Sequence, residues 1–307
     1  MRVASMFSGI GGIDLAFENL GHEIVWANDI DKYANDTYKK NFPDTLLIED
    51  NICNINEKML PDFDLLIAGF PCQSFSIMGY QRGFKDPRGN LFFEIERIVK
   101  EKQPQIIFLE NVKNLVKHDG GKTFTVIYTI LSELNYYIKY KIMSPHKYTN
   151  IPQLRERIFI VAFKDLTRCE NFRFPELVCL TKTINDFIDR SEIHHNVYYY
   201  NEENIYFDTL NKRIRDKEAI YRIDDWGVAN RKWEICPTLK ANMGTYSDRV
   251  SVIRDDFGIR KLTPYECLKL QGFSDGFKFA NIPINEAYKQ CGNTVCVKIV
   301  EKILKPL

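Results

Sequence analysis

Residues 64–75 are Asp64-Leu65-Leu66-Ile67-Ala68-Gly69-Phe70-Pro71-Cys72-Gln73-Ser74-Phe75. The first half is a short apolar run bounded by a glycine, which is typical of a buried strand. Cys72 follows the predicted strand end directly, held by Pro71 and flanked by polar residues, and a cysteine in this position is placed like a nucleophile. The alternative is a small buried hydrophobic residue, the ordinary role of cysteine in a reducing compartment.

Short apolar runs alternate with helix-like stretches through the first ~165 residues, and this alternation predicts an α/β fold with a mostly parallel sheet. Leu91–Lys102 has apolar residues at spacings of three and four, as an amphipathic helix requires. The predicted strands are Val3–Phe7, Ile24–Asn28, Leu65–Ala68, Ile106–Leu109 and Arg157–Phe163. The predicted helices are Ile13–Leu20, Lys32–Asn41, Leu91–Lys102 and Lys122–Leu134.

The character of the sequence changes after about residue 170, because long apolar runs give way to irregular polar and aromatic stretches. This change predicts a second, smaller domain of irregular strands and loops. Further on, Thr263, Pro264 and Glu266 predict a helix start, with Thr263 as the N-cap. The tail from Lys298 is predicted to form a last helix that returns to the first domain.

Composition excludes several classes of protein. A hydrophobic content of 45% excludes a disordered chain. The net charge of +1 gives no global signal for nucleic acid, so a DNA-binding surface would have to be local. The eight cysteines form no C-x-x-C pair, so no metal site is expected. Without an apolar run of about 18 residues or a signal peptide, the protein is expected to be cytoplasmic.

The residues Phe7-Ser8-Gly9-Ile10-Gly11-Gly12 lie between a predicted strand and a predicted helix. Glycines there permit a tight turn and close approach of a ligand to the backbone. The third glycine of G-x-G-x-x-G is absent, which argues against a dinucleotide site. Asp29 ends the next predicted strand, where a carboxylate can accept both hydroxyls of a ribose. A helix-capping aspartate is the alternative.

Two further motifs carry charged residues. Glu110 stands at the end of the predicted strand Ile106–Leu109, which would neighbour the Cys72 strand. Gln153, Arg155 and Arg157 alternate, so they project from one face of an extended segment. Such a face is costly to bury unless it meets an anion or a carbonyl. The alternatives are a solvated or capping glutamate and an edge strand with solvated charges.

Two other stretches favour contacts with nucleic acid. Residues 77–90, directly after the cysteine motif, are rich in glycine and charge, which predicts a mobile loop that closes over the site. Residues 211–261 contain 12 Lys/Arg and 8 Asp/Glu, a mild basic surplus that could reach phosphates or base edges. A solvated surface loop and a plain globular domain are the respective alternatives.

Together and in this order, these motifs resemble the DNA (cytosine-5) methyltransferase family. Residues 287–295, Ala-Tyr-Lys-Gln-Cys-Gly-Asn-Thr-Val, resemble the segment that completes its cofactor domain, and the resemblance covers residues 1–165 and 257–300. It implies a Rossmann-like methyltransferase sheet with helices on both faces and a smaller, irregular β-rich target-recognition domain. The implied boundaries are 1–180 for the catalytic and cofactor-binding domain, 181–258 for target recognition, 259–287 for a hinge and 288–307 for the C-terminal return.

The resemblance implies S-adenosylmethionine as the cofactor and S-adenosylhomocysteine as its product. Asn51-Ile52 stands where the family usually has Asp-Ile at the edge of the adenine, so Asp50 is a possible substitute for that contact. The implied cofactor-binding residues are Phe7, Gly9, Ile10, Gly11, Gly12, Asp29, Ile30, Asn51, Ile52, Leu91 and Asn293.

The resemblance also assigns the reacting groups. Cys72 would add to C6 of a cytosine flipped out of the duplex, Glu110 would act at N3, and Arg157 would contact O2. Arg155 completes the implied catalytic set by positioning the cysteine loop and the DNA backbone. The implied DNA-binding residues are Gln73, Gln81, Arg88, Gln153, Thr238 and Lys240.

The expected activity is therefore methyl transfer to cytosine C5 in a short site of double-stranded DNA. A separately encoded restriction endonuclease is a possible partner, no membrane is expected, and a monomer is favoured because one strand is modified at a time. Three alternatives stay open: the tRNA-methylating branch of the superfamily, a DNA-binding protein without turnover, and a nicotinamide dehydrogenase.

Overall fold

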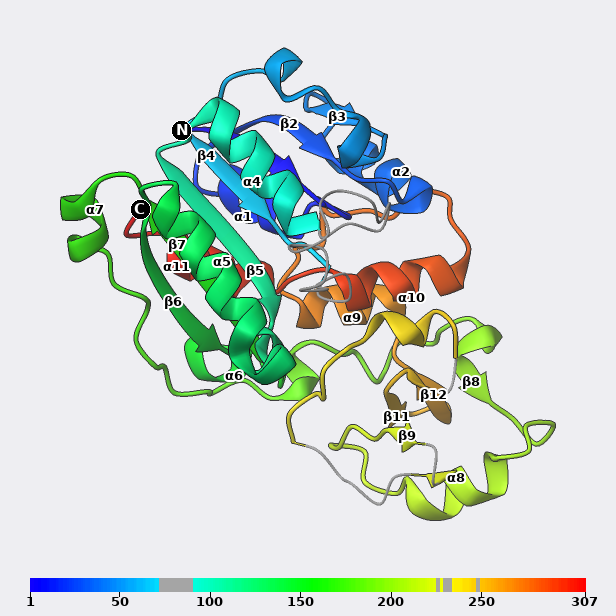
Figure 1. Cartoon of the computed structure of the whole chain (residues 1–307). Coiled ribbons are helices and arrows are strands. Elements are labelled where there is room, and N and C mark those ends of the chain that lie inside the picture. Colours follow the sequence, from blue (N-terminus) through cyan, green and yellow to red (C-terminus); the bar gives the residue numbers. More distant parts are fainter. Residues whose placement is uncertain (72–90, 225–226, 229–233, 247–248) are drawn as a thin grey trace. The chain divides into compact units, whose positions relative to one another are not determined.

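The structure is a computed structural model that describes residues 1–71, 91–224, 227–228, 234–246 and 249–307 (Figure 1). Its internal contacts divide the chain into two compact units. The first contains Met1–Met143, Glu156–Pro175 and Ile303–Leu307, and the second contains Ser144–Arg155 and Glu176–Lys302. The domain boundaries drawn from the sequence at residues 180, 258 and 287 stay predictions.

A seven-stranded sheet with the order β3-β2-β1-β4-β5-β7-β6 forms the centre of the first unit. The strands from β3 to β5 are parallel, and β7 runs antiparallel to both β5 and β6. The predicted α/β fold with a mostly parallel sheet is confirmed. The strands are β1 (Arg2–Met6), β2 (Glu23–Asn28), β3 (Leu46–Ile48), β4 (Leu65–Ala68), β5 (Ile106–Val112), β6 (Tyr137–Met143) and β7 (Arg157–Phe163).

The helices of this unit agree closely with their sequence patterns. The helices α2 and α4 have the predicted ends, whereas α1 begins one residue earlier and ends two residues earlier than predicted. Asp31 caps α2 because its carboxylate accepts the backbone N–H groups of Tyr33 and Ala34. The helices are α1 (Gly12–Glu18), α2 (Lys32–Asn41), α4 (Leu91–Lys102), α5 (Lys122–Glu133) and α7 (Leu166–Asn171).

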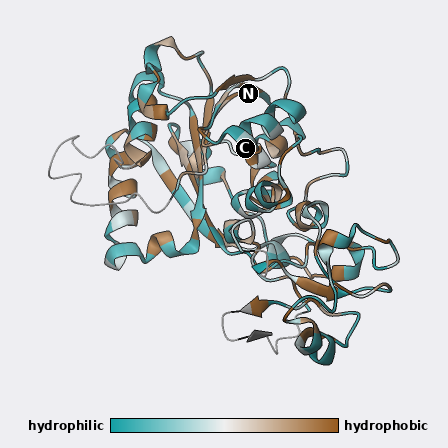
Figure 2. Ribbon diagram, turned by 90° about the vertical axis from the view of Figure 1, so that its right-hand side faces the viewer, coloured by the Kyte–Doolittle hydropathy of each residue, from teal (hydrophilic) through white to brown (hydrophobic). Residues whose placement is uncertain are grey.

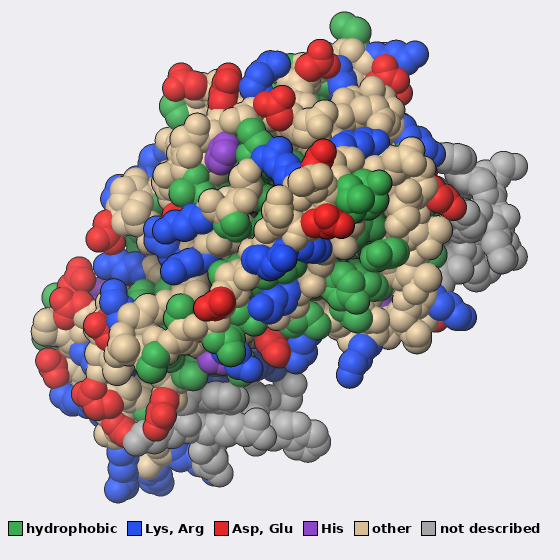
Figure 3. Space-filling model, turned by 90° about the vertical axis from the view of Figure 1, so that its left-hand side faces the viewer, with side chains coloured by type: hydrophobic (Ala, Val, Ile, Leu, Met, Phe, Trp, Pro, Cys, Tyr) green, Lys and Arg blue, Asp and Glu red, His purple; other side chains and the backbone are tan. Residues whose placement is uncertain are grey.

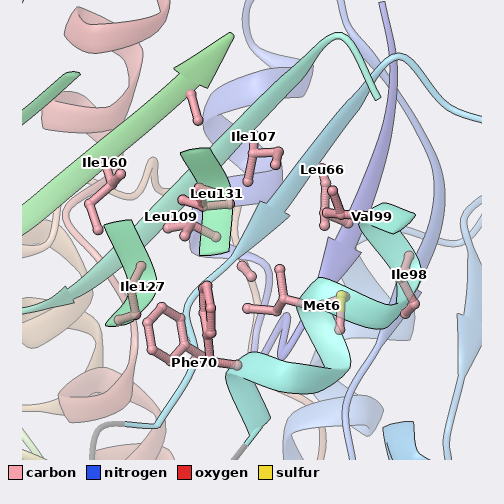
Figure 4. Packing of buried hydrophobic residues seen from close by; sticks show 14 of the residues in the cluster. Met6, Leu66, Phe70, Ile98, Val99, Ile107, Leu109, Ile127, Leu131 and Ile160 are labelled. Carbon is pink, nitrogen blue, oxygen red and sulfur yellow. The ribbon is translucent and has the colours of Figure 1, made fainter. Parts of the chain in front are cut away.

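One face of the sheet packs against α4 and α5, which cross it side by side in Figure 1. Alternate strand residues, such as Met6, Leu66 and Leu109, point to this face and meet Ile98 and Ile127 (Figure 4). All of these side chains are fully buried, so Leu66→Ala would cost about 2–5 kcal/mol of stability. The helix ribbons carry hydrophobic and hydrophilic residues in alternation (Figure 2), as expected for helices with one buried side.

The intervening strand residues point to the opposite face. Phe108 of β5 meets Phe17 of α1 edge to face, with ring centroids 6.1 Å apart. Helices therefore cover both faces, as the resemblance implies. This arrangement leaves the carboxyl ends of β1, β2, β4 and β5 at a common edge, which is the usual binding edge of such sheets.

The edge strand β6 was absent from the sequence prediction because lysines interrupt its apolar residues. Tyr140 and Ile142 are exposed, and Lys139 and Lys141 donate to backbone carbonyls of the segment after β7. On the face shown in Figure 3, Lys and Arg side chains lie among hydrophobic ones. Lysines on an edge strand oppose pairing with another chain.

The second unit contains short strands and helices around its own small core. Thr263 and Glu266 form the predicted capping box at the start of α9. Arg260, fully buried, pairs with Asp255 and Glu266 and so ties β12 to α9. The elements are α6 (Pro145–Tyr148), β8 (Tyr199–Tyr200), α8 (Phe207–Arg213), β9 (Ile223–Asp224), β10 (Gly227–Val228), β11 (Val252–Arg254), β12 (Ile259–Lys261), α9 (Pro264–Leu270) and α10 (Ile284–Asn293).

The last helix, α11 (Val297–Leu304), begins one residue before the predicted tail helix, and Ile303–Leu307 belong to the first unit. The role of the second unit in target recognition stays a prediction. Over the described ranges, no helix is long and apolar enough to cross a membrane.

Candidate active site

The glycine turn lies at the carboxyl end of β1. Phe7 has a positive φ of 56°, which is rare for a bulky residue and typical of strained functional turns. Gly9 and Gly11 also have positive φ. A Cβ on Gly11 would lie 2.3 Å from the Phe42 ring, whereas a Cβ on Gly9 would meet nothing within 4 Å. The backbone at Gly11 is therefore packed tightly against the Phe42 ring, whereas the backbone at Gly9 faces open space.

Asp29, at the end of β2, holds this turn in place. One carboxylate oxygen accepts the N–H of Gly9 at 2.8 Å, and the other accepts the N–H of Asp31 at 2.9 Å. Burial raises the pKa of Asp29 above its usual value. The next residue, Ile30, is 70% exposed, which is unusual for a large apolar side chain beside a buried carboxylate. Together these groups offer a carboxylate for hydroxyls and an apolar surface for a flat ring.

The segment after β3 carries Asp50, Asn51 and Ile52. The side-chain amide of Asn28 donates to the carbonyl oxygens of Ile48 and Asp50, both at 2.8 Å, and so fixes this segment beside β2. The Asn51 side-chain oxygen accepts the N–H of Cys53 at 3.0 Å, while Asp50 accepts the N–H of Asn51. Asn51 is half-buried and Asp50 is exposed. The sequence prediction missed Asn28, although a polar residue ending an apolar strand just before Asp29 is a usable signal.

Glu110 and Arg157 meet at the ends of β5 and β7. The guanidinium Nε of Arg157 lies 3.0 Å from a carboxylate oxygen of Glu110, and each side chain is 14% exposed. Beside them, the buried amide of Asn111 donates to the carbonyl oxygen of Phe70 at 2.8 Å. Because Phe70 lies two residues before Cys72, this bond ties the Glu110 strand to the chain that leads to the predicted nucleophile.

Several predicted site residues lie outside the described residues. These are Cys72, Gln73, Gln81 and Arg88, together with the predicted closing loop at residues 77–90. Leu91, the first residue of α4, is half-buried and packs against the core that α4 and α5 share with the sheet.

The remaining predicted residues lie in the second unit. Gln153 is fully buried and its amide donates to the carbonyl oxygen of Leu270 at 3.1 Å. Arg155 is 2% exposed. Thr238 is half-buried and its hydroxyl donates to the carbonyl oxygen of Leu154, whereas Lys240 and Asn293 are exposed. The boundary between the two units falls within this motif, because Gln153 and Arg155 belong to the second unit and Arg157 belongs to the first, which also holds Glu110. The shared face of the three side chains stays a prediction.

Known proteins match this chain over its whole length. The family described as C-5 cytosine-specific DNA methylase matches residues 1–307. Type II methyltransferase M.Bsp6I of Bacillus sp. (strain RFL6) is 46% identical, over 99% of this chain and 97% of that protein. Type II methyltransferase M.HhaI of Haemophilus parahaemolyticus is 36% identical, over 99% of this chain and 93% of that protein.

Solved structures share the fold. The DNMT2 protein of Spodoptera frugiperda superposes with a TM-score of 0.77 at 23% identity, over 99% of this chain and 98% of that one. The Dnmt2 methyltransferase of S. pombe gives a TM-score of 0.77 at 22% identity, over 99% and 97%. At such identities the likeness shows the fold alone. The full-length sequence matches show more: the chain belongs to the C-5 cytosine-specific DNA methylase family and is a DNA (cytosine-5) methyltransferase.

Proposed function

We propose that this enzyme transfers the methyl group of S-adenosylmethionine to C5 of a cytosine flipped out of a short, specific duplex site, through a covalent bond between Cys72 and C6. The observation that carries the proposal is the Glu110–Arg157 pair beside the Asn111–Phe70 bond. It puts an acid and a cation at the strand end next to the chain that leads to Cys72.

The chemistry requires these groups because cytosine C5 is a poor nucleophile. Addition of the Cys72 thiolate to C6 makes C5 electron-rich enough to take a methyl group, while negative charge develops toward N3 and O2. Glu110 would hydrogen-bond N3 and Arg157 would contact O2, which stabilises that charge. Loss of the C5 proton then expels the thiolate and restores the aromatic ring. Arg155 is included in the proposed catalytic set as a residue that positions the cysteine loop and the DNA backbone.

Among the described cysteines, several are unsuited to act as the thiolate. Burial raises the pKa of Cys236 to about 12 and that of Cys296 to about 11. The pKa of Cys53 and that of Cys169 are also raised by burial. A thiol with a raised pKa is a weak source of thiolate at neutral pH. This supports Cys72, which the motif places after a strand end.

The first unit has the features that S-adenosylmethionine needs. Gly9 leaves open space for a ligand, the carboxylate of Asp29 can take ribose hydroxyls, and Ile30 offers an apolar surface to the adenine. When bound, the cofactor supplies an electrophilic methyl group on a sulfonium and leaves as S-adenosylhomocysteine. The proposed contacts also include Phe7, Ile10, Gly11, Gly12, Asn51 or Asp50, Ile52, Leu91 and Asn293.

The DNA contacts are proposed from the family motifs. Gln73, Gln81 and Arg88 would act near the flipped base, and Thr238 and Lys240 in target reading. Gln153 is fully buried, so it would act indirectly, through the backbone carbonyl of Leu270 that its amide binds. Because the relatives are named Type II methyltransferases, a separately encoded restriction endonuclease is the expected partner. We propose that the enzyme works as a monomer in the cytoplasm.

The test uses duplex DNA and labelled S-adenosylmethionine, with tRNA as a second acceptor and base-resolution mapping of the product. Wild type should label cytosine C5 at one short motif. With 5-fluorocytosine in that motif, it should form a denaturation-stable adduct, because fluorine cannot leave as the C5 proton does. Cys72→Ala should bind the cofactor without transfer or adduct, whereas Cys179→Ala, which changes an exposed cysteine, should behave as wild type. Label on tRNA alone, or full activity in Cys72→Ala, would refute the proposal.

A further inference from the structure

Two segments that are distant in sequence pair within the second unit. The N–H of Cys236 donates to the carbonyl oxygen of Pro152 at 2.7 Å, and the N–H of Leu154 donates to that of Cys236 at 2.8 Å. The hydroxyl of Thr238 adds a bond to the carbonyl oxygen of Leu154 at 2.5 Å. Residues 152–155 and 236–239 thus form a short parallel ladder. The motif that leads into β7 is fixed beside the residues expected to read the target.

Arg155 extends this ladder to a third segment. Its Nη1 donates to the carbonyl oxygen of Leu239 at 2.8 Å. Its Nη2 donates to those of Gly292 at 3.1 Å and Thr294 at 2.5 Å. A buried guanidinium stays charged, so these carbonyl dipoles must offset its lost hydration. Neither Lys nor Gln could reproduce that fork, which spans two segments at once.

The segments that Arg155 joins are also packed at backbone distance. A Cβ on Gly292 would lie 2.1 Å from the backbone of Lys240 and Ala241, so only glycine fits there. Asn293 stands between the two carbonyl groups that Nη2 binds, and Lys240 directly follows the one that Nη1 binds. Asn293 and Lys240 are exposed, whereas Arg155 is buried beneath them.

We propose that Arg155 is a positioning residue, whose single guanidinium sets the backbone of Asn293 on the cofactor side and of Lys240 on the DNA side. The proposal rests on the proposed function, in which those two exposed residues contact S-adenosylmethionine and DNA. It gives Arg155 no contact with the reacting base. Loss of the fork would therefore weaken both ligands together, even though the residue touches neither.

The test is Arg155→Lys, which keeps the charge and loses the fork. Calorimetric titration with S-adenosylmethionine should show a Kd raised about 10-fold, and KM for duplex DNA should rise about as much, since each reflects roughly one lost hydrogen bond to a charged group. The value of kcat should fall much less than KM rises. A loss of kcat with Kd and KM unchanged would overturn the proposal, because that pattern belongs to a group acting on the reacting atoms.

A double-mutant cycle separates positioning from general damage. In an Asn293→Ala background, Arg155→Lys should change the cofactor Kd by less than about 2-fold, because the side chain through which it acts is gone. Full additivity would contradict the proposal. Arg190→Lys is the matched control, since Arg190 also donates to backbone carbonyls of this unit, those of Arg254 and Ala219. It should leave Kd, KM and kcat unchanged.

Two further outcomes are distinguishable. If wild type binds no S-adenosylmethionine, or Asn293→Ala leaves its Kd unchanged, the proposed function fails rather than the role of Arg155 alone. If Arg155→Lys does not fold, Thr238→Val tests the same ladder with a nearly isosteric change that removes the bond to Leu154. A raised Kd for S-adenosylmethionine in that variant supports the proposal, because Thr238 is proposed to contact DNA and not the cofactor, and an unchanged Kd overturns it.

Discussion

The carboxylate of Glu110 and the guanidinium of Arg157 pair diagonally across β5 and β7. Glu110 lies opposite Phe159 in the antiparallel register, and Arg157 lies opposite Val112, so the two charged residues are offset by two positions on one face. Their atoms are 3.0 Å apart and each side chain is 14% exposed. A charged pair that is so little exposed offsets the free-energy cost of its desolvation only with precise geometry, which favours a functional role over an incidental ion pair.

Glu110→Gln should lower kcat for methyl transfer by about 10²–10³-fold, because an isosteric amide cannot supply the proton or the charge that N3 requires. Single-turnover methyl transfer with saturating cofactor and DNA measures this effect. Arg157→Lys should lose activity to a similar degree, since Lys cannot replace the planar fork.

A matched control lies on the same pair of strand ends. Lys113 pairs with Glu156, and this pair is much more exposed. Exposed pairs contribute at most about 1 kcal/mol, so Lys113→Ala should keep near-wild-type kcat. Equal losses in Lys113→Ala and Glu110→Gln would mean that local structure, rather than the Glu110 carboxylate, accounts for the effect.

Asn111→Ala removes the buried bond to the Phe70 carbonyl oxygen. We expect a loss of about 1–3 kcal/mol in the free energy of unfolding, because that buried carbonyl is left unsatisfied. The rate of adduct formation with 5-fluorocytosine DNA should fall as well, since the chain before Cys72 is no longer anchored. Urea denaturation and gel-based trapping measure the two effects. Asn41→Ala, which removes an amide bond to Thr37 at the end of α2, should leave trapping unchanged.

The sequence predicted the central strands well because their hydrophobic runs are continuous. Leu65–Ala68, Ile106–Leu109 and Ile158–Phe163 are apolar runs buried on both faces of the sheet. The edge strands β3 and β6 escaped prediction because β3 has only three residues and β6 is interrupted by lysines. The last three residues of β5 extend past its apolar run, since pairing with β7 rather than hydrophobicity holds them.

The sequence indicated the placement of candidate-site residues that follow a strand end. It did not indicate the partners that these residues meet through long-range contacts. Alternation places Gln153, Arg155 and Arg157 on one side of an extended segment, but says nothing of what lies opposite. Of the two partners considered for buried arginines, an anion or a carbonyl, Arg157 meets a carboxylate and Arg155 meets carbonyls. The carbonyl at Leu239 lies 84 residues away, beyond the reach of any local pattern.

Asp29→Asn should weaken S-adenosylmethionine binding, because an amide has one acceptor oxygen where a carboxylate has two. That single oxygen cannot accept both from the N–H of Gly9 and from the ribose hydroxyls as the carboxylate can. Burial raises the pKa of Asp29, so acid should protonate it at a higher pH than an ordinary aspartate and weaken wild-type binding there. Calorimetric titrations across acidic pH should show this trend in wild type and lose it in Asp29→Asn. Asp64→Asn, at the opposite end of the strands, should follow wild type.

Asp14, missed by the sequence analysis, is a buried carboxylate beneath the glycine turn. It accepts from Ser5 at 3.0 Å and from Tyr38 at 2.8 Å, and burial raises its pKa to about 6 from 3.8. A raised folded-state pKa means that folding disfavours the charged form, so this group's contribution to stability falls as pH rises from about 4 to about 6 and then stays low.

Asp14→Asn removes this dependence. Relative to the variant, wild type should therefore lose about 1.4 kcal/mol of unfolding free energy between pH 5 and pH 7.5. The reason is that over roughly one pH unit of this range the carboxyl is still protonated in the folded state and already charged in the unfolded state. Urea denaturation at the two pH values measures the difference, with Asp208→Asn, an exposed carboxylate, as the control that should track wild type. Parallel profiles for wild type and Asp14→Asn would show that the carboxylate beneath the glycine turn is not held in a charge-disfavouring site.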